Sequence, residues 1–298
     1  MIRLENTSGG AVAAAIHEER HRIGAPTSGM VLTLLIMADE ETQADATDGA
    51  LTAARQHPMR ILTLIGRPDS RQTQLDAEIR VGGDDGPGEV ALLRLRNELA
   101  NYPNSVAVPL LLPDTPVVAY WPGESPEVPS DSLIGRHAQR RITDASFDED
   151  PYQALRVRQR GYQPGDTDLS WARCTQWRSV IAAIFDAPMA RVNHVRVTGE
   201  HNNPSVILMG AWLGQMFETS FEIIWDDTIA ISGVELDMDD GVLRITRMND
   251  KEANIQRPGY PDQRVSLPRR PTSALLAEEL RRLDPDDMYG QVIAGLSL

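Results

Sequence analysis

The chain has 298 residues, of which 41% are hydrophobic and 24% charged, as in an ordinary globular protein of one large or two medium domains. Its 43 acidic and 29 basic residues give a formal charge of −14, which disfavours nucleic acid as a partner because phosphate binding needs clustered cations. The single cysteine, Cys174, excludes an intramolecular disulfide and a cysteine-based zinc site. The first ten residues lack the features of a signal peptide, and the apolar run 30–38 is too short to span a membrane. We therefore expect a soluble, cytoplasmic protein.

The first half of the chain predicts an α/β domain with a three-layer-like mixed sheet. Apolar runs of strand length, bounded by turn residues, are typical of strands buried on both faces. Two such runs flank a helical stretch, which gives a strand–helix–strand unit with a parallel crossover. The expected elements are helices at 10–23 and 39–56, strands at 30–38 and 60–66, a hairpin of 75–81 with 89–96, a helix at 97–112, and strands at 115–121 and 140–146.

The second half predicts a smaller, mixed α+β domain. The turn-rich segment 162–168 marks the boundary, which gives an N-terminal domain at 1–164 and a C-terminal domain at 165–298. The expected elements after the boundary are helices at 175–185 and 204–217, a strand at 192–198, alternating strands between 221 and 267, and helices at 272–283 and 285–296.

His17, Glu18 and His21 match the H-E-x-x-H pattern on a predicted helix. In zinc peptidases this spacing puts two imidazoles on one helix face and leaves the glutamate as general base. A third ligand is needed, and Glu40 or Glu41 could supply it only if the next strand returned to the helix. The alternative is an exposed helix end, where His and Arg side chains complement the helix dipole. A zinc-dependent hydrolase is therefore an alternative function, with His17 and His21 as its candidate metal ligands.

No pattern for nucleotide chemistry or nucleophilic catalysis is present in a usable context. The loop Gly24–Gly29 precedes a strand, whereas phosphate-binding loops follow a strand and open a helix. The loop that does follow the first buried strand, 38–41, is acidic and would repel pyrophosphate. An isolated cysteine such as Cys174 is most often a packed, inert thiol. We expect no catalytic residue and no cofactor, while arginines such as Arg60 and Arg67 leave a sugar-phosphate or nucleotide sensor as a further alternative.

Two apolar and aromatic clusters remain, LLLPDTPVVAYWPG at 110–123 and DLSWARCTQWR at 168–178. Core packing at the edge of two domains explains both clusters. The alternative is a partner-facing patch, because Trp, Tyr and Arg are common interface anchors. The candidate structural or interface positions are Pro113, Asp114, Pro116, Trp121, Asp168, Trp171, Trp177 and Arg178.

These two clusters are similar to the corresponding motifs of the OpcA family, the glucose-6-phosphate dehydrogenase assembly proteins. Further segments extend the resemblance over essentially the whole chain: ERHRIGAPTSGMVLTLLIMADE, HPMRILTLI, AEIRVGGDDGPGEVALLRLR and LAEELRRLDPDDMY. The resemblance implies a non-catalytic protein, without a cofactor of its own, that binds glucose-6-phosphate dehydrogenase and promotes its assembly or activation. Family members in photosynthetic bacteria are linked to thiol redox control, but with Cys174 alone an internal disulfide switch is excluded here.

Overall fold

The computed structural model describes residues 1–24, 29–82, 88–185 and 190–297. The chain forms two compact units, and each unit is assembled from three separate segments. Unit 1 comprises Met1–Phe147, Gln163–Thr167 and Pro271–Asp286, and unit 2 comprises Asp148–Tyr162, Asp168–Arg270 and Asp287–Leu298. The sequence analysis instead expected one boundary between residues 164 and 165.

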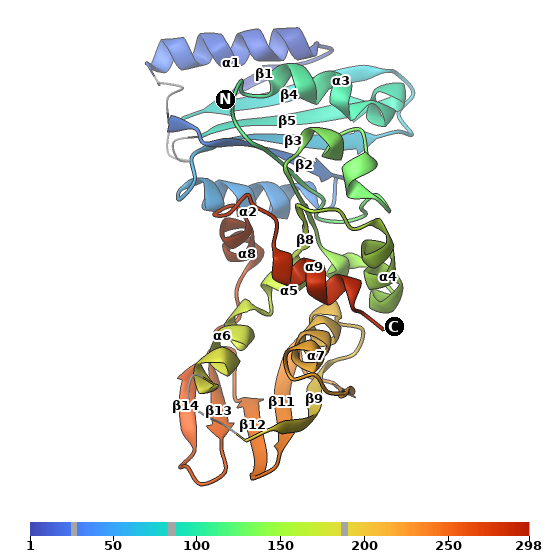
Figure 1. Ribbon diagram of the computed structural model, residues 1–298. Coiled ribbons are helices and arrows are strands. Elements are labelled where there is room, and N and C mark those ends of the chain that lie inside the picture. The colour runs from blue at the N-terminus through green and yellow to red at the C-terminus, as the bar shows by residue number, and fades with distance from the viewer. Residues whose placement is uncertain (25–28, 83–87, 186–189, 298) are drawn as a thin grey trace. The chain divides into compact units, whose positions relative to one another are not determined.

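The mixed α/β class expected from the sequence is confirmed. Sheet A has eight strands among the described residues, in the order β1-β4-β5-β3-β2-β6-β7-β8. Helices α1 and α2 lie on opposite faces of this sheet, which gives three layers (Figure 1). The strands are β1 (Ile2–Leu4), β2 (Leu32–Ala38), β3 (Met59–Arg67), β4 (Gln74–Val81), β5 (Glu89–Arg96), β6 (Val117–Tyr120), β7 (Arg140–Thr143) and β8 (Asp166–Asp168). The helices of unit 1 are α1 (Gly9–Ile23), α2 (Gln43–Ala54), α3 (Pro103–Ala107) and α8 (Thr272–Glu279).

Helix α1 has clear start and stop signals. Ser8 caps its first turn, where the hydroxyl accepts a hydrogen bond from the Ala11 amide at 3.2 Å. Gly24 ends the helix in the left-handed conformation, with φ of 66°. The helix buries Val12 and Ile16 in a core formed with one face of sheet A. In that core lie Leu75, Ala77, Ile79, Leu93, Leu95 and Trp121.

The strand–helix–strand unit and the hairpin are confirmed. Strands β2 and β3 pair in parallel, with Leu32 opposite Met59 and Ala38 opposite Ile65. Strands β4 and β5 pair antiparallel, from Gln74–Arg96 to Val81–Glu89. Strand β5 then pairs in parallel with β3. The apolar runs therefore occupy the centre of the sheet, as continuous hydrophobic strands in parallel sheets do.

The single helix expected at 97–112 is wrong. The structure has three short helical pieces there: Asn97–Asn101, Pro103–Ala107 and Val108–Leu110. Pro103 and Pro109 lack the N–H that a continuous helix needs, and Asn97 has a positive φ of 54°. The apolar residues of this segment lie on short helical pieces, and two of these, Pro103–Ala107 and Val108–Leu110, pack against α1.

Unit 2 contains sheet B, with six strands among the described residues in the order β10-β9-β11-β12-β13-β14. Helix α7 packs on β9 and β10, and its glycines Gly210 and Gly214 allow close approach of the Phe221 ring. The strands are β9 (Val192–Glu200), β10 (Phe221–Asp226), β11 (Ile231–Met238), β12 (Gly241–Arg247), β13 (Glu252–Gln256) and β14 (Gln263–Ser266). The helices are α4 (Pro151–Gly161), α5 (Leu169–Ala172), α6 (Thr175–Ile184), α7 (Pro204–Met216) and α9 (Asp287–Ala294).

Helix α4 was missed by the sequence analysis although its start signal is present. Asp150 caps it by accepting from the Gln153 amide at 3.0 Å, and Pro151 occupies the first helical turn. In the described part of the chain, no helix combines the length and apolar character needed to cross a lipid bilayer.

Candidate functional site

The H-E-x-x-H residues lie in the last turns of α1, with His17, Glu18 and His21 exposed. The two imidazoles are in contact, with 3.0 Å between their Nε2 atoms. A guanidinium nitrogen of Arg20 donates to His17 Nδ1 at 2.9 Å. Within the described residues no group of three or more His, Cys, Asp or Glu side chains converges on a metal position. The structure therefore gives His17 and His21 no third protein ligand from the residues it describes, and Glu40 instead pairs with Arg67 at 2.6 Å.

The three tryptophans of the aromatic clusters are core residues. Trp121 is 4% exposed, Trp171 0% and Trp177 2%. In unit 2 the Arg178 guanidinium lies 3.7 Å from the centre of the Trp171 ring, within the range of a cation–π contact. Asp168 is fully buried and caps α5 by accepting from the Ser170 amide at 2.9 Å. The structure thus places these motif residues in packing and capping positions.

The proline motif of the first cluster differs, because part of it is on the surface. Pro113 and Asp114 are exposed, and Asp114 has a positive φ of 54°. The Thr115 hydroxyl donates to the Leu112 carbonyl at 3.1 Å, and the Pro116 carbonyl accepts from the Thr33 amide at 2.9 Å. This turn leads the chain into β6 and holds Pro113 and Thr115 at the mouth of a cavity.

Cys174 is a packed thiol, as expected from the sequence. It is fully buried, and burial raises the pKa of its thiol to about 12. Its Sγ lies 3.3 Å from the Ser205 carbonyl oxygen. At neutral pH it is a protonated, unreactive group.

The cavity has a volume of about 470 Å³ and lies at the amino edge of sheet A. The parallel register aligns the starts of four strands there: Leu32 with Met59, Arg60 with Glu89, and Thr33 with Val117. Its walls come from α1, from the start of β3 and from the segments that lead into β2 and β6. The lining residues are Ala13, Ile16, His17, Arg20, Met30, Arg60, Leu112, Pro113 and Thr115.

Two arginines of this cavity share one buried carboxylate. The Glu89 side chain is 4% exposed, Arg60 10% and Arg20 17%. Arg60 donates through Nε to Glu89 at 2.7 Å and through Nη1 to the Leu110 carbonyl at 2.6 Å. Arg20 reaches the other Glu89 oxygen at 3.3 Å. Arg20, Arg60 and Glu89 together therefore carry a net charge of +1, and all three side chains are largely shielded from water.

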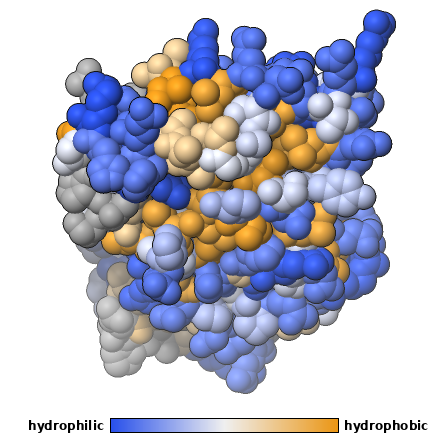
Figure 2. Space-filling model, turned by 90° about the horizontal axis from the view of Figure 1, so that it is seen from above, coloured by the Kyte–Doolittle hydropathy of each residue, from blue (hydrophilic) through white to orange (hydrophobic). Residues whose placement is uncertain are grey.

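The face of unit 1 that carries α1 combines apolar and charged surface. Figure 2 looks onto this face and shows hydrophobic residues gathered among hydrophilic ones. Partly buried apolar residues of this core include Ala13, Ala15, Leu99, Ala100 and Leu111.

The opposite, carboxyl edge of sheet A is where open α/β sheets usually bind ligands, because the strand order changes direction there. Here β2 lies between β3 and β6, so the change falls at the loop after Ala38. Asp39 occupies this loop: its Oδ1 accepts from the Glu41 amide at 2.9 Å and the Thr42 amide at 2.7 Å. The hydrogen bond from the Thr42 amide holds the pKa of Asp39 below its ordinary value. The N–H groups that would face a pyrophosphate are thus occupied by a carboxylate of the chain itself.

A second cavity, of about 460 Å³, lies at the carboxyl ends of β3 and β5. Two of its arginines are paired in place: Arg94 with Glu78 at 2.8 Å, and Arg96 with Asp76 at 2.8 Å. Arg67, considered above for phosphate, pairs with Glu40, and this hydrogen bond lowers the pKa of Glu40. Unlike Arg20 and Arg60, each of these three arginines has a carboxylate partner of its own.

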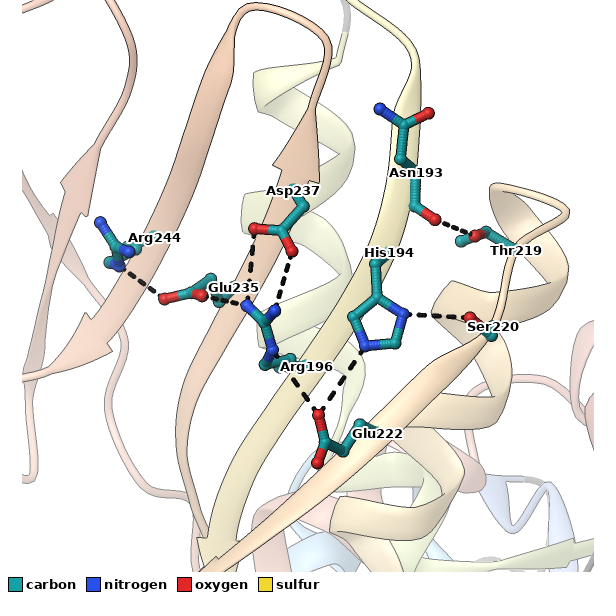
Figure 3. A network of polar contacts seen from close by, with 9 residues as sticks. All are labelled: Asn193, His194, Arg196, Thr219, Ser220, Glu222, Glu235, Asp237 and Arg244. Carbon is teal, nitrogen blue, oxygen red and sulfur yellow. Dashed lines mark hydrogen bonds and ion pairs between the residues drawn. The ribbon is translucent and has the colours of Figure 1, made fainter.

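Sheet B carries a polar network on its exposed face that the sequence analysis missed (Figure 3). His194 contacts the Ser220 hydroxyl at 3.0 Å through Nδ1 and lies 3.8 Å from Glu222 through Nε2. The order serine–histidine–acid resembles a hydrolase triad, but the Glu222 side chain is 60% exposed and also pairs with Arg196 at 3.6 Å. A solvated face of this kind does not provide the water-excluded, preorganised site that acyl transfer needs.

Two family models match the chain. The model described as the glucose-6-phosphate dehydrogenase subunit N-terminal domain matches residues 50–160, and that of the corresponding C-terminal domain matches residues 164–293. The chain belongs to the OpcA family. The OpcA matches cover most of the sequence, and they meet between residues 160 and 164. Comparison with curated protein sequences gives no match.

Solved structures similar to this OpcA-family chain include KijD10, a 3-ketoreductase from Actinomadura kijaniata. The two sequences are 11% identical, the match covers 89% of this chain and 94% of the KijD10 chain, and the TM-score is 0.48. The putative oxidoreductase yvaA from Bacillus subtilis has 9% identity over 88% of this chain and 94% of that one, with a TM-score of 0.46. At these values the similarities carry no conclusion about activity.

Proposed function

We propose that this OpcA-family protein binds glucose-6-phosphate dehydrogenase and promotes its assembly or its active conformation without catalysing a reaction itself. The observation that carries the proposal is the pair of family matches, whose descriptions name a dehydrogenase subunit. The cytoplasmic location expected from the lone, reduced Cys174 stays a prediction.

The carboxyl edge of sheet A supports a non-catalytic role. A dehydrogenase of this topology would hold the pyrophosphate of its cofactor on the N–H groups after the first parallel strand. In this chain the Asp39 carboxylate takes the Glu41 and Thr42 amides. An incoming pyrophosphate would meet a negative charge and would have to break two hydrogen bonds.

The test is a titration of the purified protein into the glucose-6-phosphate dehydrogenase of the same organism. A ligand shifts an equilibrium only through different affinities for the two states, so activation must saturate with concentration. We expect a saturable rise in dehydrogenase activity or sugar-phosphate affinity, with co-sedimentation of the two proteins. The protein alone, given glucose 6-phosphate and NADP, is the control and should reduce no NADP. Absence of both a complex and a kinetic change at micromolar concentrations would remove the proposal.

A further inference from the structure

We propose that the amino-edge cavity of unit 1 binds a small organic anion, in which one carboxylate or phosphate group is attached to a compact apolar body. The proposal goes beyond the proposed function and does not depend on it. It rests on the charge, the hydrogen-bond donors and the shape of the cavity between α1 and residues 112–115.

The charge of the cavity calls for an anion. Arg20 and Arg60 carry two positive charges, and Glu89 supplies one negative charge among them. Burying an unmatched charge is costly, so groups of this kind occur where a ligand completes the balance. No further carboxylate appears among the described lining residues. A carboxylate beside Arg20 would neutralise the group, and a phosphate monoester would make it slightly negative.

The donors of the cavity are suited to an oxyanion. An arginine has five N–H groups. Arg20 directs one to Glu89 and one to His17 among the described residues, and Arg60 directs its Nε and Nη groups to Glu89 and the Leu110 carbonyl. Arg20 and Arg60 both line the cavity, so the N–H groups that these contacts do not use are the proposed donors to carboxylate or phosphate oxygens.

The tautomer of His17 follows from the same contacts. Because Arg20 donates to His17 Nδ1, that nitrogen is the acceptor, and the proton of the neutral ring lies on Nε2, from which it is donated to His21 Nε2. His17 thus fixes the Arg20 guanidinium in place from the outer side while Glu89 fixes it from the inner side. Such fixed donors lose less freedom when a ligand binds.

The apolar lining of the cavity favours a ligand whose part beyond the anionic group is apolar. Ala13, Ile16, Met30, Leu112 and Pro113 supply apolar lining beside the arginines. Besides the arginines, only His17 and Thr115 are polar among the described lining residues, so a sugar with many hydroxyl groups would lose more hydrogen bonds to water than it regained. The volume of about 470 Å³ lies within the range of small-molecule sites.

The experiment uses fluorine NMR of the full-length protein with 4-fluorobenzoate and 4-fluorophenyl phosphate, and with neutral 4-fluorobenzamide as the uncharged control. We expect saturable binding of at least one anion and at least tenfold weaker binding of the amide, because a charge-assisted hydrogen bond is lost. Arg20→Gln should weaken anion binding by about tenfold or more. Arg22→Gln is the matched control on the same helix, since the Arg22 side chain is 68% exposed and pairs with Glu19, and it should bind like the unaltered protein.

A second variant tests the cavity without changing its charge. Ala13→Leu places a good helix former in the wall and should block the apolar body of both anions, with an unchanged circular dichroism spectrum. No saturable binding of either anion at about 10 mM, equal binding of the amide, or unchanged binding by both Arg20→Gln and Ala13→Leu would overturn the proposal. Dehydrogenase activation is not a readout here, so failure of this experiment leaves the proposed function intact.

Discussion

At the carboxyl edge of sheet A, every acidic side chain described above has a partner from the chain itself, whereas at the amino edge two arginines share one glutamate. Asp39 caps the turn after β2, and Glu40 pairs with Arg67 in a place open to solvent. Arg20 and Arg60 instead line a cavity, and the Glu89 carboxylate that both contact is only 4% exposed. Both edges thus carry a cavity, but Arg67, Arg94 and Arg96 at the carboxyl edge each have a carboxylate partner, whereas Arg20 and Arg60 at the amino edge share one.

The two edges show that the amides at the usual ligand edge of an α/β sheet can be satisfied by the chain itself. One carboxylate at position 39 satisfies the amides that would otherwise face an anion. The arginines of the amino-edge cavity lie instead near the starts of the strands, beside α1 and residues 112–115.

The largest effect is expected at the amino edge. Glu89→Gln leaves two buried arginines without a counter-charge and should lower the free energy of unfolding by about 3 kcal/mol. Urea unfolding measures this change in the free energy of unfolding. Glu78→Gln is the matched control at the carboxyl edge, because Glu78 pairs with Arg94 with both side chains more than 20% exposed, and it should cost less than about 1 kcal/mol. If Glu89→Gln and Glu78→Gln lowered the free energy of unfolding equally, the ion pairs at the two edges would be equally shielded from water.

An intermediate effect is expected from Asp39→Ala. The substitution frees the Glu41 and Thr42 amides in the turn before α2 and should lower the free energy of unfolding by about 1 kcal/mol, the usual net contribution of a hydrogen bond. Asp45→Ala is the control, since Asp45 lies in the first turn of α2 and helps only through the helix dipole. If Asp39→Ala lowered the free energy of unfolding no more than Asp45→Ala does, the role of Asp39 in this turn would be refuted.

The same carboxylate predicts a dependence on pH. The pKa of Asp39 is below its ordinary value of 3.8 in the folded protein, so the contribution of its charge to stability is present above that value and is lost as the pH falls through the folded-state pKa. The difference in melting temperature between the unaltered protein and Asp39→Asn should therefore be constant near neutral pH and shrink below about pH 4. A difference that grows on acidification has the wrong sign for this account.

The smallest effect is expected from Arg67→Gln. Its partner Glu40 has a side chain 44% exposed, so the loss of this pair should change the free energy of unfolding by about 0.5 kcal/mol. Binding of 4-fluorobenzoate should not change. A tenfold loss of binding in this variant would move the anion site to the carboxyl edge.

Much of the fold could be predicted from local patterns. The apolar runs in β2 and β3, the cap at Ser8 and the stop at Gly24 are signals within a few residues of the elements they define. The helix expected at 97–112 failed because apolar spacing was given more weight than Pro103 and Pro109, which break helices.

The candidate site was harder to predict because its residues are distant in sequence. Arg60 and Glu89 meet only because β3 and β5 pair in parallel with these two residues opposite each other. The hairpin was predicted, but which strand would lie beside β5 was not. Arg20 was seen only as part of a possible metal-binding helix, and no local signal connects it to Glu89. The acidity of the loop at Asp39 was visible in the sequence, whereas its hydrogen bonds to the Glu41 and Thr42 amides needed the structure.

The most direct test of the contrast between the two edges is a crystal of the protein soaked with 4-bromobenzoate and measured at the bromine absorption edge. The account predicts an anomalous bromine peak inside the amino-edge cavity, near Ile16 and Pro113, with the carboxylate on the Arg20 guanidinium. A bromine peak beside Asp39 and Thr42 instead, with an empty amino-edge cavity, would contradict it.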